Sequence, residues 1–172
     1  EGACTDPACL MYGIYDTPLS PHFGNEIVEA IIARLDINIA VADSDERLAS
    51  LLKIREKTGR PLRIFALRQE SSSDAGIPCL VEECKNLSAA EIHETLSSLP
   101  PLSTNRVATT MFTSGSTGLP KGVSFSLYNI VSKRFARAAA LPTAGNEVFL
   151  CYLPLYHTFG RFLELTGSIF WN

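Results

Sequence analysis

The chain has 172 residues and a net charge of −3, with 46% hydrophobic and 19% charged residues. This is enough chain to bury a real core, and the composition excludes a disordered protein. No apolar run reaches the roughly 18 residues needed to cross a bilayer, and the acidic start EGACTDPACL lacks a signal-peptide pattern.

The apolar pattern predicts strands alternating with helices through the first 100 residues. A short strand is expected at 11–15 and a helix at 22–36, where apolar residues recur at helical spacing. The run INIAVA at 37–42 is short, β-branched and nearly free of charge, which predicts a buried strand.

A second helix follows this strand. Asp43 and Glu46 predict a capping box at its start, and Gly59 predicts its end. The next strand is expected at 61–67, and Ser88 with Glu91 predicts a capping box for a helix within 87–99. Together these elements predict the α/β class, with a layered, largely parallel sheet and flanking helices.

The segment PPLSTN at 100–105 breaks this pattern and predicts a linker between two portions, 1–99 and 106–172. In the second portion Arg161 and Glu164 are three residues apart on the last predicted helix, where they could pair. The elements expected there are a strand at 107–112, a glycine-rich loop, a strand at 122–126, a helix at 127–140, a strand at 147–153 and a turn at 154–160.

Charge is unevenly divided between the two portions. Residues 1–100 hold 9 Lys and Arg against 16 Asp and Glu, whereas residues 101–172 hold 6 against 2. The basic portion contains the glycine-rich loop, which suits an anionic ligand. A nucleic-acid surface is not predicted, because Lys133, Arg134 and Arg137 are few and are expected on the solvated face of a helix.

No metal site is predicted. Five cysteines is an odd number, and four residues separate the members of each closer pair, with no histidine pair beside them. Reduced thiols in a cytoplasmic protein are the expectation.

The stretch TSGSTGLPKG at 113–122 has the composition of a loop that holds a polyphosphate. Its glycines allow close approach of a ligand, its hydroxyl side chains can donate hydrogen bonds, and Lys121 adds a positive charge. The spacing matches neither the P-loop of nucleotide hydrolases nor the dinucleotide fingerprint.

The same stretch, extended to Val123, resembles the phosphate loop of the adenylate-forming superfamily, which includes acyl-CoA synthetases, firefly luciferases and the adenylation domains of peptide synthetases. A second block, EVFLCYLPLYHTFGRFLEL at 147–165, is similar to long-chain acyl-CoA synthetases. The resemblance is strong from 106 to 165 and loose before it. It implies part of the large N-terminal domain of such an enzyme, with the C-terminal remainder absent.

The resemblance also implies roles for individual residues. Lys121 would contact the departing pyrophosphate, and His157 would lie beside the acyl substrate and orient it; these two are the expected catalytic residues. Tyr156 and Phe159 would line the acyl site with His157. The residues expected to hold the ATP phosphates are Thr113, Ser114, Gly115, Ser116, Thr117, Gly118 and Lys121.

The implied reaction joins a carboxylic acid, with a long-chain fatty acid as the expected substrate, to AMP and then to coenzyme A, with ATP and Mg²⁺ required. A cytoplasmic protein with peripheral membrane contact is expected, and this chain alone should be inactive. Two alternatives stay open. The chain could be a non-catalytic nucleotide-binding fragment, or part of an adenylation domain that acts on amino acids.

Overall fold

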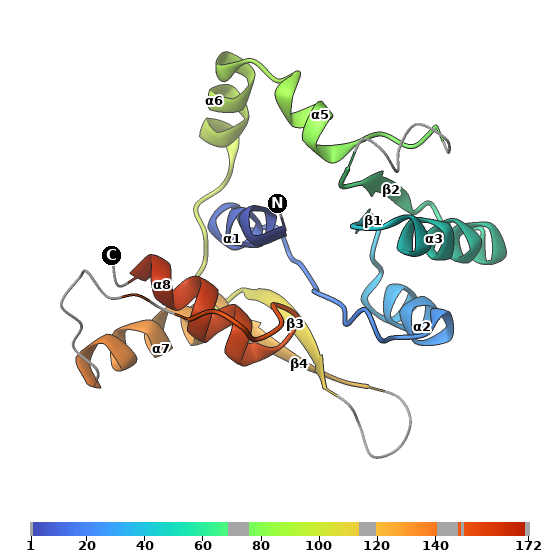
Figure 1. Cartoon of the computed structure of the whole chain (residues 1–172). Helices are drawn as coiled ribbons and strands as arrows, with labels where there is room; N and C mark the ends of the chain where they lie inside the picture. The colour runs from blue at the N-terminus through green and yellow to red at the C-terminus, as the bar shows by residue number, and fades with distance from the viewer. Residues whose placement is uncertain (1, 69–75, 114–119, 141–147, 149, 171–172) are drawn as a thin grey trace. The chain divides into compact units, whose positions relative to one another are not determined.

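The computed structural model describes residues 2–68, 76–113, 120–140, 148 and 150–170 (Figure 1). The chain folds as two compact units. One is continuous, His22–Ser98, and the other combines Glu1–Pro21 with Leu99–Asn172. The second boundary lies beside the predicted linker, and the first 21 residues fold with the C-terminal part. The assignment of 1–99 and 106–172 to subdomains of a longer protein stays a prediction.

The unit His22–Ser98 alternates helices and strands. Strands β1 and β2 pair in parallel, with Ile39 opposite Arg63, and α3 connects them as the predicted crossover. This pairing confirms the α/β class. The elements are α2 (Asn25–Leu35), β1 (Ile39–Ala42), α3 (Asp45–Thr58), β2 (Arg63–Ala66), α5 (Leu80–Lys85) and α6 (Ala89–Ser98).

The core of this unit lies between α2, α3 and the strand pair, and contains Ile32, Leu48, Leu51, Ile54 and Ile64. The prediction of a buried strand at 37–42 was wrong for one face of β1. Ile39 and Val41 are 54% and 42% exposed, while Ala42 on the opposite face is buried. Side chains alternate between faces of a strand, and only one face of β1 packs against this core.

The helix ends follow local signals, with one correction. Gly59 ends α3 in the left-handed region at φ 62°, as predicted. The start of α3 is capped by Ser44, whose Oγ accepts from the Arg47 amide, and not by Asp43. The box at Ser88 is confirmed, because the Ser88 amide donates to Glu91 at 2.8 Å and the Glu91 amide donates to Ser88 Oγ at 3.2 Å.

In the other unit the strands form an antiparallel hairpin, with Met111 opposite Val123. The backbone of Asp16 also forms a single parallel bridge with Thr109, which lies in the first strand of this hairpin. The elements are α1 (Gly2–Tyr12), β3 (Val107–Thr113), β4 (Lys121–Ser126), α7 (Leu127–Ala140), the π-helix η1 (Phe159–Leu165) and α8 (Thr166–Phe170). Its core contains Leu10, Ala108, Met111, Ile130 and Phe162.

Two predicted strands do not form among the described residues of this unit. Residues 11–15 form no strand, because Met11 and Tyr12 complete α1 and Gly13 turns the chain at φ 71°. Of the segment 147–153, the described residues form no strand either, and Val148 is 99% exposed. Such runs become strands only where another strand offers its hydrogen bonds.

Helix α7 has the predicted bounds of 127–140, and Ser126 with Asn129 caps its start. Its basic residues do not share a solvated face as expected, because Arg134 is only 9% exposed. Among the described residues, no helix combines the length and apolar character required to cross a membrane.

Candidate active site

The glycine-rich segment connects the two strands of the β3–β4 hairpin. Thr113, the last residue of β3, lies opposite Lys121, the first residue of β4, and Thr113 Oγ1 donates to the Lys121 carbonyl at 3.4 Å. Both side chains are exposed. A hydroxyl and an ammonium group therefore stand side by side at one end of the hairpin, where they can reach an anion.

Five of the predicted phosphate-binding residues lie outside the described residues. They are Ser114, Gly115, Ser116, Thr117 and Gly118. Their roles, and those of Thr113 and Lys121, stay predictions.

His157 closes a turn after Pro154, to whose carbonyl its amide donates at 3.0 Å. Its ring stacks on Phe159 with centroids 6.0 Å apart and an interplanar angle of 20°, and its Nδ1 accepts from the Phe159 amide. His157 and Phe159 are exposed and Tyr156 is half-buried. An exposed imidazole held against an aromatic ring can orient a bound molecule.

Gly160 allows this turn to approach the π-helix closely. A Cβ built on Gly160 would collide with the Pro154 carbonyl oxygen and lie 2.6 Å from the Leu153 carbonyl oxygen. Both are backbone atoms, which cannot rotate away. Glycine at 160 therefore determines how near the His157 turn lies to η1.

A buried cluster of charges anchors η1 next to this turn. Arg161 is fully buried and contacts Asp6 of α1, Asp16, and the hydroxyl of Thr109 in β3. Its Nε lies 3.0 Å from Asp6 Oδ2, and its Nη2 lies 2.7 Å from Asp16 Oδ2. The Arg161 amide also donates to the His157 carbonyl at 2.9 Å. The cluster thus ties the start of the chain to the segment that carries His157 and Phe159.

Burial and the contacts within the cluster shift the pKa values of Asp6 and Arg161. Burial raises the pKa of Asp6 to about 6; Arg161 opposes the shift and Asp16 adds to it. Burial alone would lower the pKa of Arg161, but its bonds to Asp6 and Asp16 raise it overall.

The expected pairing of Arg161 with Glu164 is wrong. Glu164 is buried and its carboxylate accepts from the Leu153 amide at 2.9 Å, while Arg161 contacts Asp6 and Asp16. In a π-helix the residue offset differs from that of an α-helix, so three-residue spacing does not bring two side chains together.

Sequence reasoning missed this cluster as a unit. One signal was available, since Arg161 and Glu164 interrupt an apolar run, and charges inside such a run are buried only with partners. Asp6 and Asp16 carry no such signal, because they lie about 150 residues away in the sequence.

Two pairs of predicted site residues lie next to each other in the structure. Thr113 is opposite Lys121 in the hairpin, and His157 stacks on Phe159. Within the described residues, no hydrogen bond or ring contact joins one pair to the other. The described residues therefore present an exposed hydroxyl and ammonium at the hairpin end and an exposed imidazole at the His157 turn.

The family is established by comparison with known proteins. Residues 3–171 match the model of the AMP-binding enzyme family, and the chain belongs to that family.

Its relatives include long-chain acyl-CoA synthetases. The chain is 29% identical to long-chain-fatty-acid–CoA ligase 5 of Rattus norvegicus, over 99% of this chain and 26% of the ligase. It is 28% identical to long chain acyl-CoA synthetase 3 of Arabidopsis thaliana, over 91% of this chain and 25% of the synthetase. The chain thus spans about a quarter of the length of these relatives.

Solved structures share the fold. ATP-bound MatB from Rhodopseudomonas palustris superimposes with a TM-score of 0.70 at 21% identity, covering 95% of this chain and 31% of MatB. McyG A-PCP complexed with phenylalanyl-adenylate gives 0.68 at 23% identity, covering 95% of this chain and 24% of McyG. This chain therefore has the fold of part of the N-terminal domain of adenylate-forming enzymes.

Proposed function

We propose that the protein to which this chain contributes activates a carboxylic acid with ATP, forming acyl-AMP and then acyl-CoA. The observation that carries the proposal is the β3–β4 hairpin, which presents Thr113 and Lys121 at the two ends of TSGSTGLPK. The names of the relatives support a long-chain fatty acid as the acid, and the ATP in the MatB structure supports ATP as the nucleotide.

The chemistry explains why these groups are needed. A carboxylate and a triphosphate repel each other, so the site must neutralise charge and align the attack on the α-phosphate. Lys121 would stabilise the charge on the departing pyrophosphate, while Ser114, Ser116 and Thr117 would donate hydrogen bonds to the phosphates. Coenzyme A would then accept the acyl group.

Mg²⁺ would neutralise phosphate charge in the same reaction. The described residues at this end of the hairpin, Thr113 and Lys121, offer no carboxylate for the ion, so we assign its ligands to neither. A cytoplasmic location with peripheral membrane contact, which a long-chain acid favours, is part of the proposal.

Exchange of pyrophosphate into ATP, measured on the complete gene product with palmitate as the acid, tests the proposal. Lys121→Ala should lower the exchange rate by about 100-fold or more, because it removes a charge that stabilises the transition state. Lys53→Ala is the matched control, since it removes an exposed lysine from α3. It should leave the exchange rate unchanged.

The outcomes separate the alternatives. Exchange that survives Lys121→Ala unaltered removes the role given to that lysine. Exchange driven by phenylalanine and not by palmitate would favour amino-acid activation. A protein that binds ATP but exchanges no pyrophosphate with any acid would be a non-catalytic nucleotide-binding protein.

A further inference from the structure

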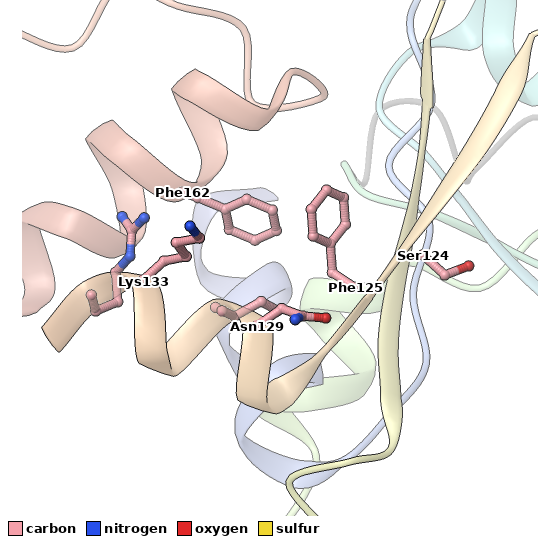
Figure 2. A pocket seen from close by; sticks show the side chains of 7 residues that line it. Ser124, Phe125, Asn129, Lys133 and Phe162 are labelled. Atoms are coloured by element: carbon pink, nitrogen blue, oxygen red, sulfur yellow. The ribbon is translucent and has the colours of Figure 1, made fainter. Parts of the chain in front are cut away.

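A cavity of about 290 Å³ lies between β4, α7 and η1, and its lining includes none of Thr113, Lys121 and His157 (Figure 2). The rings of Phe125 and Phe162 form its apolar wall and meet edge to face, with centroids 5.3 Å apart. Ile130 extends this wall from α7. Figure 2 shows the two rings facing each other above Asn129 and Lys133.

The cavity is also lined by a buried cation, two of whose donors have no partner among the described residues. Arg134 lines it and is 9% exposed, and its Nε and Nη1 are buried with no hydrogen-bond partner among the described residues. Burial lowers the pKa of Arg134, and the nearby Arg137 lowers it further. A second cation, Lys133, lines the same cavity from an exposed position.

The described carboxylates of this unit bind groups other than Arg134. Asp6 and Asp16 both bind Arg161, and Glu164 accepts from the Leu153 amide. A buried guanidinium with unsatisfied donors is costly, and an anion is the group that removes this cost most directly.

We propose that this cavity is a second ligand site, one that binds a small organic acid through its carboxylate at Arg134 and Lys133 and through its apolar body at Phe125 and Phe162. The volume is about ten times the roughly 30 Å³ that one water occupies, so a single inorganic anion would leave the aromatic wall uncovered. The site uses none of the residues of the proposed reaction, and it goes beyond that function.

Benzoate is a suitable probe because it combines a carboxylate with a flat apolar body. Titration followed by NMR should shift the ring signals of Phe125 and Phe162, and leave those of the His157 ring in place. Benzyl alcohol, which lacks the charge, and inorganic phosphate, which lacks the apolar body, should each bind at least tenfold more weakly than benzoate.

Arg134→Gln should weaken benzoate binding at least tenfold and Arg134→Lys less, while ATP affinity stays unchanged in both. Lys121→Ala should show the reverse, with weaker ATP binding and unchanged benzoate binding. This crossed pattern separates a failure of the second site from a failure of the proposed function. Lys133→Gln, at an exposed position, gives a further variant should Arg134→Gln not fold, and it too should weaken benzoate.

Three results would overturn the proposal. Benzoate affinity could be equal in the wild type, Arg134→Gln and Lys133→Gln. Phosphate could bind as tightly as benzoate, which would make the cavity a site for inorganic anions. The benzoate-induced shifts could map to the His157 ring, which would place the acid at the reaction site instead.

Discussion

Arg161 is a single side chain on which three separate segments depend. Its guanidinium binds Asp6, Asp16 and Thr109, and its own backbone lies in η1. A buried cation of this kind is tolerated because its partners satisfy its donors. These contacts hold η1, the helix that follows the His157 turn, against α1 and β3.

The burial of Asp6 makes stability depend on pH. The folded-state pKa of Asp6, about 6, lies above its ordinary value of 3.8, so the folded state holds a proton that the unfolded state has lost. The contribution of Asp6 to the free energy of unfolding is therefore largest below pH 4 and decreases as the pH rises to about 6. Asp6→Asn removes this titration and keeps an acceptor for Arg161.

Urea unfolding of the wild type and of Asp6→Asn between pH 4 and 7 measures the effect. The stability of the variant relative to the wild type should increase with pH across the window from 4 to 6. Carboxylates outside the cluster contribute equally to both proteins and cancel in the difference, whereas Asp16 raises the pKa of Asp6 and is part of the measured effect. A difference that stays constant with pH would show that Asp6 has an ordinary pKa in the folded protein.

At the scale of elements, two neighbouring residues, Asp43 and Ser44, are candidates for the N-cap of α3. Ser44→Ala should lower the free energy of unfolding by about 1 kcal/mol, because the Arg47 amide loses its acceptor. Asp43→Ala, one residue earlier and exposed, should change it by less than about 0.5 kcal/mol. Urea unfolding of both variants measures these changes. A larger loss of unfolding free energy for Asp43→Ala than for Ser44→Ala would show that Asp43 is the cap.

Elements with strong local signals were predictable from the sequence. Helix α7 has its apolar period and polar cap, α3 has Gly59, and α6 has the Ser88–Glu91 box, so each could be placed. Helix α5 could not, because its six residues are too few for a period to show. The false strand at 11–15 had suitable residues but no strand partner, and pairing is not visible in a short window.

The candidate site also contains parts that could be predicted from the sequence and parts that could not. The hairpin ends and the His157 turn could be found because their residues are contiguous in the sequence. The Arg161 cluster could not, because its members come from α1, the segment after it, β3 and η1. The burial of Arg134 was missed for a related reason, since η1 supplies one wall of its cavity from a distant segment.

At the scale of the whole molecule, the first 21 residues complete a unit whose remainder begins at Leu99. Leu10 belongs to the core of that unit, and the Thr110 amide donates to the Asp16 carbonyl at 3.2 Å. Deletion of residues 1–21 should therefore weaken β3 and η1 and leave the other unit intact.

Hydrogen exchange measured by mass spectrometry tests this expectation. In the shortened chain the amides of β3 and η1 should exchange at least tenfold faster, whereas those of α3 should keep their wild-type rates and act as an internal control. Equal protection of β3 with and without residues 1–21 would mean that the N-terminal segment adds nothing to that unit.

The bond between Arg161 and Asp6 spans 155 residues, which has a consequence for synthesis on the ribosome. The elements of the unit His22–Ser98 lie within one continuous stretch, so this unit can fold as it emerges. Residues 1–21 are made first but must wait, with Leu10 and Asp6 unpaired, until the chain has grown past η1. The order of translation and the order of folding are therefore reversed for this segment, which leaves Leu10 exposed to solvent during that interval.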